Sequence, residues 1–125
     1  MVVVYYDLTN GSCRKTRHWF RERHIEIQER RVDYISKNDL LHALFLSEEG
    51  FFELLKRPSR CDERVKVLLE KVYSLSFNEA LQFILEHVEL LKTPLIFDDH
   101  SLVIGYNAEA IRVFISSAQR KIQIK

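Results

Sequence analysis

The side chain with the clearest potential for chemistry is Cys13, close to the start of the printed sequence. A β-branched and aromatic run over 2–6 predicts a strand, and a short polar loop then delivers Cys13 to the first turn of a predicted helix. The free N–H groups and the positive end of the helix dipole favour a thiolate at that place. Basic residues add positive charge nearby, at Arg14, Lys15 and Arg17. A redox-active C-x-x-C pair would have its first cysteine three residues before Cys13, but that residue is Asn10. The sequence therefore predicts a local structure suited to thiol chemistry that contains only one of the two cysteines of a redox pair.

The composition limits the class of protein. Nineteen Lys and Arg against 18 Asp and Glu give a net charge of +1, which predicts neither strong nucleic-acid affinity nor attraction to a membrane. No apolar run approaches the roughly 20 residues that span a bilayer, and Val2–Val4 lacks the flanks of a signal peptide. The five histidines have no metal-ligand spacing with Cys13 and Cys61, so we expect no metal and no other cofactor. Two cysteines make no disulfide framework, and we expect both as thiols in the cytoplasm.

Hydrophobic periodicity and turn residues predict an α/β fold. The expected elements are a strand at about 2–6, a helix at 13–23, a strand at 24–32, helices within about 36–91, strands at 93–98 and 101–105, and a final helix after Asn107. This order predicts a thioredoxin-like, mixed four-stranded sheet with a helical insertion at about 36–91, in a single domain over 1–125.

Capping signals locate the helices of the insertion. Ser36 and Ser76 each precede an acidic residue by three positions, which is the spacing of a capping box. Ser47, followed by Glu48 and Glu49, predicts a further helix with an N-cap and two acids at its start. The leucine stripes and the phenylalanines of these helices are expected in the core, Phe45, Phe51 and Phe52 among them.

Four short stretches stand in the order of a known family: Ser12-Cys-Arg-Lys15, Ser47-Glu-Glu-Gly50, Leu90 to Asp99, and Val103 to Asn107 followed by Glu109 and Ile111-Arg112. With them the chain resembles the arsenate reductase–Spx family from Val2 to about Ile115, and within it the Spx regulators, which bind RNA polymerase. The resemblance implies a thioredoxin-like fold and a cis peptide bond before Pro94, a rare form that would be a shape requirement next to the thiol.

The resemblance also implies which catalytic residues an enzyme of this family needs. Its arsenate reductases attack arsenic with one loop cysteine and hold the oxyanion with arginines. The position of the nucleophile matches Asn10, and the positions of the arginines match Pro58, Thr93 and Tyr106. We therefore expect no arsenate reductase activity. The enzymatic alternative is a thiol-dependent reductase with a degenerate site that uses Cys13, for instance on glutathione mixed disulfides.

As an Spx-like regulator, the chain is expected to bind the C-terminal domain of the RNA polymerase α subunit. The two cysteines of the Spx disulfide switch match Asn10 and Cys13, so we expect a protein without that switch, in one constant state. The glycine that matches Gly50 lies at the docking surface of Spx, and Glu48 and Glu49 beside it are candidate polar contacts. A local turn explains the glycine equally well on spacing alone, and acids at a helix start are also expected for the dipole.

Basic residues over 14–23 form the one candidate nucleic-acid surface: Arg14, Lys15, Arg17, Arg21 and Arg23. Contact with promoter phosphates is expected only together with polymerase. A solvated face of an amphipathic helix is the other explanation of the same residues. We expect a monomer without membrane contact.

Overall fold

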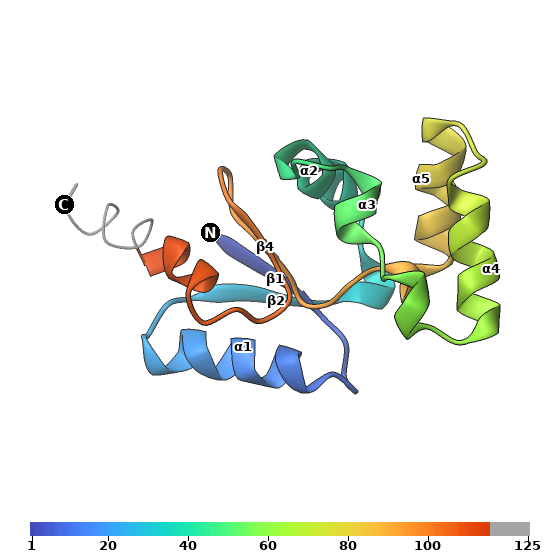
Figure 1. Cartoon of the computed structure of the whole chain (residues 1–125). Coiled ribbons are helices and arrows are strands. Elements are labelled where there is room, and N and C mark those ends of the chain that lie inside the picture. Colours follow the sequence, from blue (N-terminus) through green and yellow to red (C-terminus); the bar gives the residue numbers. More distant parts are fainter. Residues whose placement is uncertain (116–125) are drawn as a thin grey trace. The chain divides into compact units, whose positions relative to one another are not determined.

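The computed structural model describes residues 1–115 and divides into two compact units (Figure 1). The first unit combines Met1–Val32 with the chain from Thr93 onward, and the second comprises Asp33–Lys92. The helical insertion expected at about 36–91 falls within the second unit. The part of the predicted final helix beyond residue 115 lies outside the described residues.

The first unit is built on a mixed four-stranded sheet, as the sequence predicts. Its strands are β1 (Val2–Tyr6), β2 (Ile27–Arg31), β3 (Leu95–Phe97) and β4 (Leu102–Ile104), in the order β2-β1-β3-β4. β1 pairs parallel with β2 and antiparallel with β3, and β3 and β4 form the predicted antiparallel hairpin. The helix α1 (Gly11–Glu22) makes the crossover between the two parallel strands.

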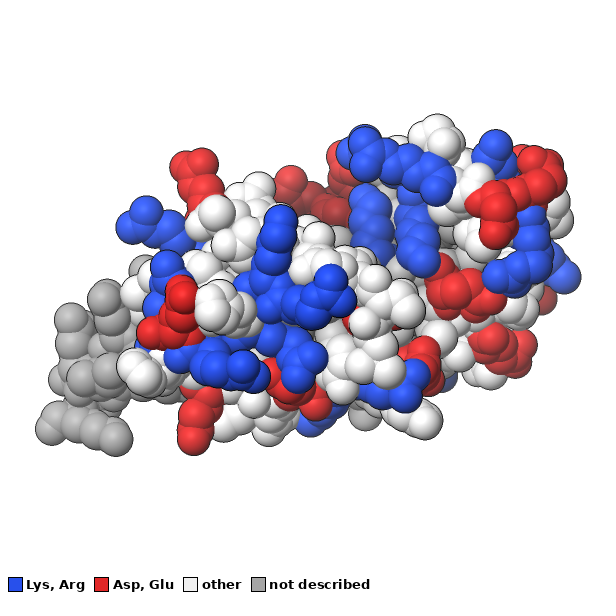
Figure 2. Space-filling model, turned by 90° about the horizontal axis from the view of Figure 1, so that it is seen from below, with Lys and Arg blue, Asp and Glu red and all other residues white. Residues whose placement is uncertain are grey.

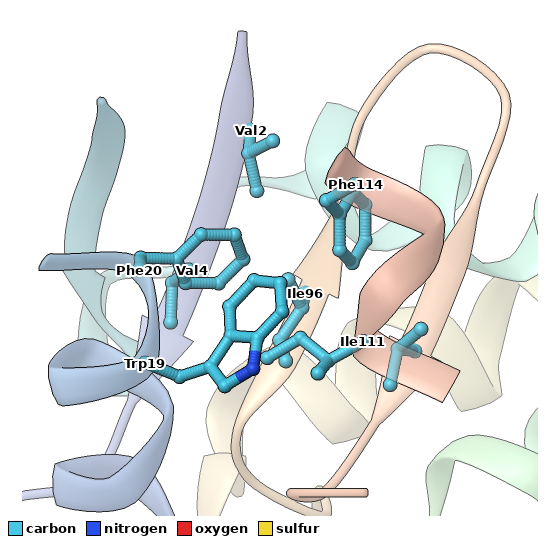
Figure 3. Close-up of a cluster of buried hydrophobic side chains, with 8 residues drawn as sticks. Val2, Val4, Trp19, Phe20, Ile96, Ile111 and Phe114 are labelled. Carbon is cyan, nitrogen blue, oxygen red and sulfur yellow. The ribbon is translucent and has the colours of Figure 1, made fainter. Parts of the chain in front are cut away.

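A cluster of apolar side chains holds α1 on the sheet (Figure 3). Val2 and Val4 lie two positions apart on β1 and therefore point to the same face of the sheet. On that face they pack with side chains of the hairpin, of α1 and of the C-terminal segment: Ile96, Val103, Trp19, Phe20, Ile111 and Phe114. The ring of Phe20 is fully buried and lies edge-on to Trp19 at 5.0 Å between centroids and 5.9 Å from Phe114. These contacts hold the C-terminal half of α1 on the sheet.

The second unit consists of short helices: α2 (Lys37–Leu46), α3 (Phe51–Leu54), α4 (Glu63–Val72) and α5 (Phe77–Glu86), with 3-10 turns at Pro58–Arg60 and Val88–Leu90. A further 3-10 turn, Val32–Tyr34, begins at the last residue before this unit. The predicted caps of α2 and α5 are confirmed. The Ser36 hydroxyl accepts the Asp39 N–H at 3.0 Å, and Ser76 and Glu79 form a reciprocal capping box.

Two predictions for the second unit are wrong. Ser47 does not begin a helix, because its hydroxyl donates to the Leu44 carbonyl at 2.6 Å and ends α2 instead. The next helix, α3, begins only after Gly50. The helical segment expected to extend to about residue 91 also ends earlier, since α5 ends at Glu86 and Leu91 forms an isolated antiparallel bridge with Leu55. Pairing with a distant segment outweighs the local helical pattern there.

Candidate functional site

The loop between β1 and α1 places Cys13 as the third residue of the helix. Asn10 is the N-cap, and its Oδ1 accepts the Ser12 N–H at 2.8 Å while its carbonyl accepts the Cys13 N–H at 3.2 Å. Asparagine is among the preferred N-cap residues because its short side chain satisfies an otherwise unpaired helix N–H. The helix therefore starts at Gly11, two residues before the predicted start.

The same asparagine side chain also reaches the chain segment that enters β3. Its Nδ2 donates to both the carbonyl oxygen and the Oγ1 of Thr93, each at 3.2 Å. The Thr93–Pro94 peptide bond is cis, and the Pro94 carbonyl accepts the Gly105 N–H at 2.8 Å. Asn10 thus connects the thiol loop, the start of α1 and the cis proline through one neutral amide group.

Cys13 lies under this loop rather than at its surface. Only 1% of the residue is exposed, and its Sγ accepts the backbone N–H of Asp7 at 3.3 Å. The Asp7 carboxylate in turn accepts both the backbone N–H and the hydroxyl of Thr9, each at 3.0 Å. The sequence places the thiol correctly at the start of the helix, but it does not reveal that the preceding loop covers the sulfur.

The basic residues of α1 gather on one face of the first unit, where Figure 2 shows Lys and Arg side chains close together. Arg17 lies with its guanidinium 5.0 Å from the centre of the Tyr6 ring, and its Nε forms a 3.2 Å ion pair with Glu29 of β2. Arg23 lies 4.3 Å over the ring of Trp19. Aromatic contacts of this kind orient the two arginines before any ligand binds. The remaining basic residues of the helix are exposed: Arg14, Lys15 and Arg21.

Gly50 adopts a backbone conformation that favours glycine, with φ +64° and ψ −135°. A Cβ atom placed there would meet nothing within 4 Å, so the constraint is the backbone and not crowding. The Gly50 N–H donates to the Ser47 hydroxyl at 3.0 Å, and its carbonyl accepts the Glu53 N–H at 3.1 Å. These bonds give the local-turn explanation of the glycine a physical basis.

Glu48 and Glu49 lie in this turn with exposed side chains. Their backbone N–H groups donate to the Glu53 carboxylate at 3.2 and 3.3 Å. One acid of the cluster is therefore used to build the turn, while the two that the sequence singles out present their carboxylates at the surface.

Two phenylalanines expected in the core flank the turn and are exposed instead. Phe45, near the end of α2, is 85% exposed, and Phe52 of α3 is 70% exposed. Because α3 starts at Phe51 and is only four residues long, Leu54 and Leu55 become the buried positions. For Phe52, the wrong start of the predicted helix accounts for the wrong core position. Phe45 belongs to α2, whose buried residues are Leu40 and Ala43, so its exposure is independent of where the next helix begins.

Within residues 1–115 no group of three or more His, Cys, Asp and Glu side chains is arranged to hold a metal ion. No helix in the same range combines the length and apolar character needed to cross a membrane. Cys61 is half-buried, its thiol donates to the Arg57 carbonyl at 3.3 Å, and neither cysteine forms a disulfide.

A parallel β1–α1–β2 unit, an antiparallel hairpin entered through a cis proline and a cysteine at the start of α1 define a thioredoxin-like fold. The chain belongs to the ArsC family, whose sequence profile matches residues 5–114.

Solved structures are similar in fold. An ArsC family related protein from Bacteroides fragilis has a TM-score of 0.73 at 18% identity, covering 90% of this chain and 95% of its own. An arsenate reductase from Vibrio cholerae has a TM-score of 0.65 at 17% identity, and the match covers 92% of this chain and 95% of the reductase.

Three relatives in sequence are named as regulators. The global transcriptional regulator Spx 2 of Bacillus anthracis is 33% identical, covering 96% of this chain and 91% of its own length. The global transcriptional regulator Spx of Bacillus subtilis is 31% identical, and the match covers 100% of this chain and 95% of the regulator. The regulatory protein MgsR of Bacillus subtilis is 35% identical over 77% of this chain and 75% of its own.

Proposed function

We propose that this protein is an Spx-like transcriptional regulator that binds the C-terminal domain of the RNA polymerase α subunit and lacks the C-x-x-C disulfide switch. The proposal includes action as a monomer in the cytoplasm. The observation that carries it is the role of Asn10, combined with an identity of about one third to Spx regulators over nearly the whole chain. At the position that matches the first cysteine, the residue caps a helix and fixes a neighbouring loop.

The same geometry argues against the reductase alternative. An amide cannot act as the nucleophile, and Thr93 supplies a neutral hydroxyl where the resemblance implies an arginine for the oxyanion. The remaining thiol, Cys13, is covered and accepts a backbone hydrogen bond. Thiolate nucleophiles of enzymes lie in partly exposed, electropositive surroundings, so a buried sulfur favours a structural role.

Absence of the switch has a direct consequence for regulation. We expect binding to the α subunit to be the same under reducing and oxidising conditions. The affinity of the protein for the α C-terminal domain, measured with dithiothreitol and after treatment with diamide, tests this. An oxidant-dependent affinity that disappears in Cys13→Ala would contradict the proposal, because the single thiol would then control binding.

We place the docking surface at the turn from Ser47 to Gly50. The substitution Gly50→Arg by itself is a poor test, because any side chain is strained at this positive φ. Gly50→Ala adds the same backbone strain without bulk, and nothing lies within 4 Å of the added Cβ. We expect Gly50→Ala to retain most of the affinity and Gly50→Arg to lose it, as measured by titration with the α C-terminal domain. Equal affinities for the wild type and both variants would place the contact elsewhere.

We further propose that the basic face of α1 contacts promoter phosphates when the protein is bound to polymerase. Arg14 and Arg21 are two helical turns apart on one side of the helix and are both exposed. The double variant Arg14→Glu with Arg21→Glu should weaken the promoter complex and leave binding to the isolated α domain unchanged. Loss of two phosphate contacts lowers the steepness of the salt dependence by about 2, since each contributes about 0.9 to the logarithmic slope. An unchanged slope would assign these residues to a solvated helix face.

A further inference from the structure

The exposed phenylalanines next to the acidic turn are unusual for a surface. Phe45 and Phe52 are 85% and 70% exposed, and they lie within eight positions of each other on either side of the segment 47–50. Single exposed apolar residues are common, but two exposed phenylalanines on either side of one turn make that turn a candidate contact surface. Aromatic residues are also enriched in protein–protein interfaces, because they bury a large area at a small cost in side-chain entropy.

Neither phenylalanine is needed to build the second unit. The buried face of α2 is formed by Leu40 and Ala43, both fully inaccessible to solvent. In the segment of α3, Leu54 and Leu55 occupy the core. The neighbouring Phe51 packs against Phe77 of α5, with 5.3 Å between ring centroids, so α3 is already secured by another ring. The fold therefore gains little from an aromatic residue at either exposed position.

Charge specifies the kind of surface that fits this place. Glu48 and Glu49 present two exposed carboxylates between the phenylalanines, whereas the Glu53 carboxylate is occupied by backbone N–H groups. A complementary partner must offer apolar recesses bordered by Lys or Arg. A nucleic acid is excluded by its own negative charge, and an anionic membrane surface by the same repulsion.

We propose that Phe45 and Phe52 are the apolar anchors by which this protein binds a basic, apolar-pocketed surface of its protein partner. The inference rests on the proposed function, which names that partner as the α C-terminal domain and the turn as the contact. The two rings enter recesses of the partner, and the two carboxylates pair with basic residues around them. Most of the affinity comes from the rings, and the acids mainly steer the encounter.

The test is a titration of the full chain with the purified α C-terminal domain, in which binding is measured by calorimetry or fluorescence anisotropy. Phe45→Ala and Phe52→Ala are each expected to weaken binding about tenfold or more. The matched control is Tyr73→Ala, which removes an aromatic side chain of similar exposure (57%) at the end of α4. It should change the affinity less than about twofold. Circular dichroism and the thermal midpoint should be the same for all three variants, since none removes a core side chain.

The outcomes separate this inference from the proposed function. Binding by the wild type that is unchanged in both phenylalanine variants refutes the anchors and leaves the regulator proposal standing. If the wild type does not bind the α C-terminal domain, the proposed partner is wrong, and Phe45 and Phe52 are not anchors for it. Light scattering supplies a third result. A wild-type dimer that Phe45→Ala or Phe52→Ala converts to a monomer would show that a second copy of this chain covers the rings, which overturns the assignment to the α subunit.

Discussion

Replacing Asn10 by alanine should destabilise the first unit by about 2 kcal/mol. The side chain makes two separable contributions. As an N-cap it satisfies the Ser12 N–H at 2.8 Å, and the loss of such a cap costs about 1 kcal/mol. Its Nδ2 also donates to the Thr93 carbonyl and hydroxyl in a partly buried place, and losing this hydrogen bond costs about 1 kcal/mol more.

Two further variants divide that sum into its parts. Asn10→Ser retains an oxygen that can cap the helix but is too short to bridge to Thr93, so it should cost about 1 kcal/mol. Asn107→Ala is the matched control in the same unit. The Asn107 Oδ1 accepts two local N–H groups, at 2.9 Å from Glu109 and 2.9 Å from Ala110. Because both donors lie in its own turn, its removal should cost about 1 kcal/mol.

Urea unfolding followed by tryptophan fluorescence measures these differences. Trp19 is the one tryptophan of the chain and lies in the core of the first unit at 6% exposure, so its signal reports on the unit that contains Asn10. The order of stability should be wild type, then Asn10→Ser together with Asn107→Ala, then Asn10→Ala. If Asn10→Ala lies within about 0.5 kcal/mol of the wild type, the connecting role of this amide is refuted.

Three other properties are predicted. In the native protein Cys61 should react with a thiol reagent at least about tenfold faster than the covered Cys13, and equal rates measured by mass spectrometry would contradict the burial of Cys13. Phe20→Ala should destabilise the first unit by about 3–5 kcal/mol in urea unfolding, and a loss below about 1 kcal/mol would mean that its site collapses without a cavity. Hydrogen bonds from the backbone and hydroxyl of Ser76 hold the pKa of the Glu79 carboxyl below its ordinary value. Its stabilising effect is therefore present above the pKa of the unfolded state and is lost as the pH falls through the lower folded pKa. Glu79→Gln should remove that part of the acid dependence of the urea midpoint, and identical acid profiles would refute it.

Local signals in the sequence predict the sheet and most helices well. The β-branched run at 2–6, the turn residues of the hairpin and the serine N-caps at Ser36 and Ser76 each act over a few neighbouring positions, and the structure confirms them. The segment 47–55 is different because Ser47 can cap the end of one helix or the start of another. The positive φ of Gly50 decides between these possibilities, and that conformation is set by hydrogen bonds to Ser47 and Glu53 on both sides of it.

The candidate site shows a second limit of sequence reasoning. Asn10 is interpreted from the sequence as the absence of a cysteine, although asparagine directly before a helix is itself a capping signal. Its hydrogen bonds to Thr93 join positions 83 residues apart, and no local pattern predicts such a pair. The cover over Cys13 likewise depends on how the loop folds back, through the Asp7 N–H, and not on residue type alone.

The two roles of Asn10 also bear on how readily this chain could acquire thiol chemistry at the loop. A single change from Asn10 to cysteine would create the C-x-x-C spacing, but it would remove the cap of α1 and the hydrogen bond to Thr93 at the same time. That substitution should therefore lower the stability by about 2 kcal/mol, a substantial part of the stability of a small domain. An arginine in place of Thr93, needed to hold an oxyanion, would bring no benefit until the cysteine is present. A route to the C-x-x-C pair through Asn10 therefore begins with a destabilising substitution, because the neutral amide already has two structural roles.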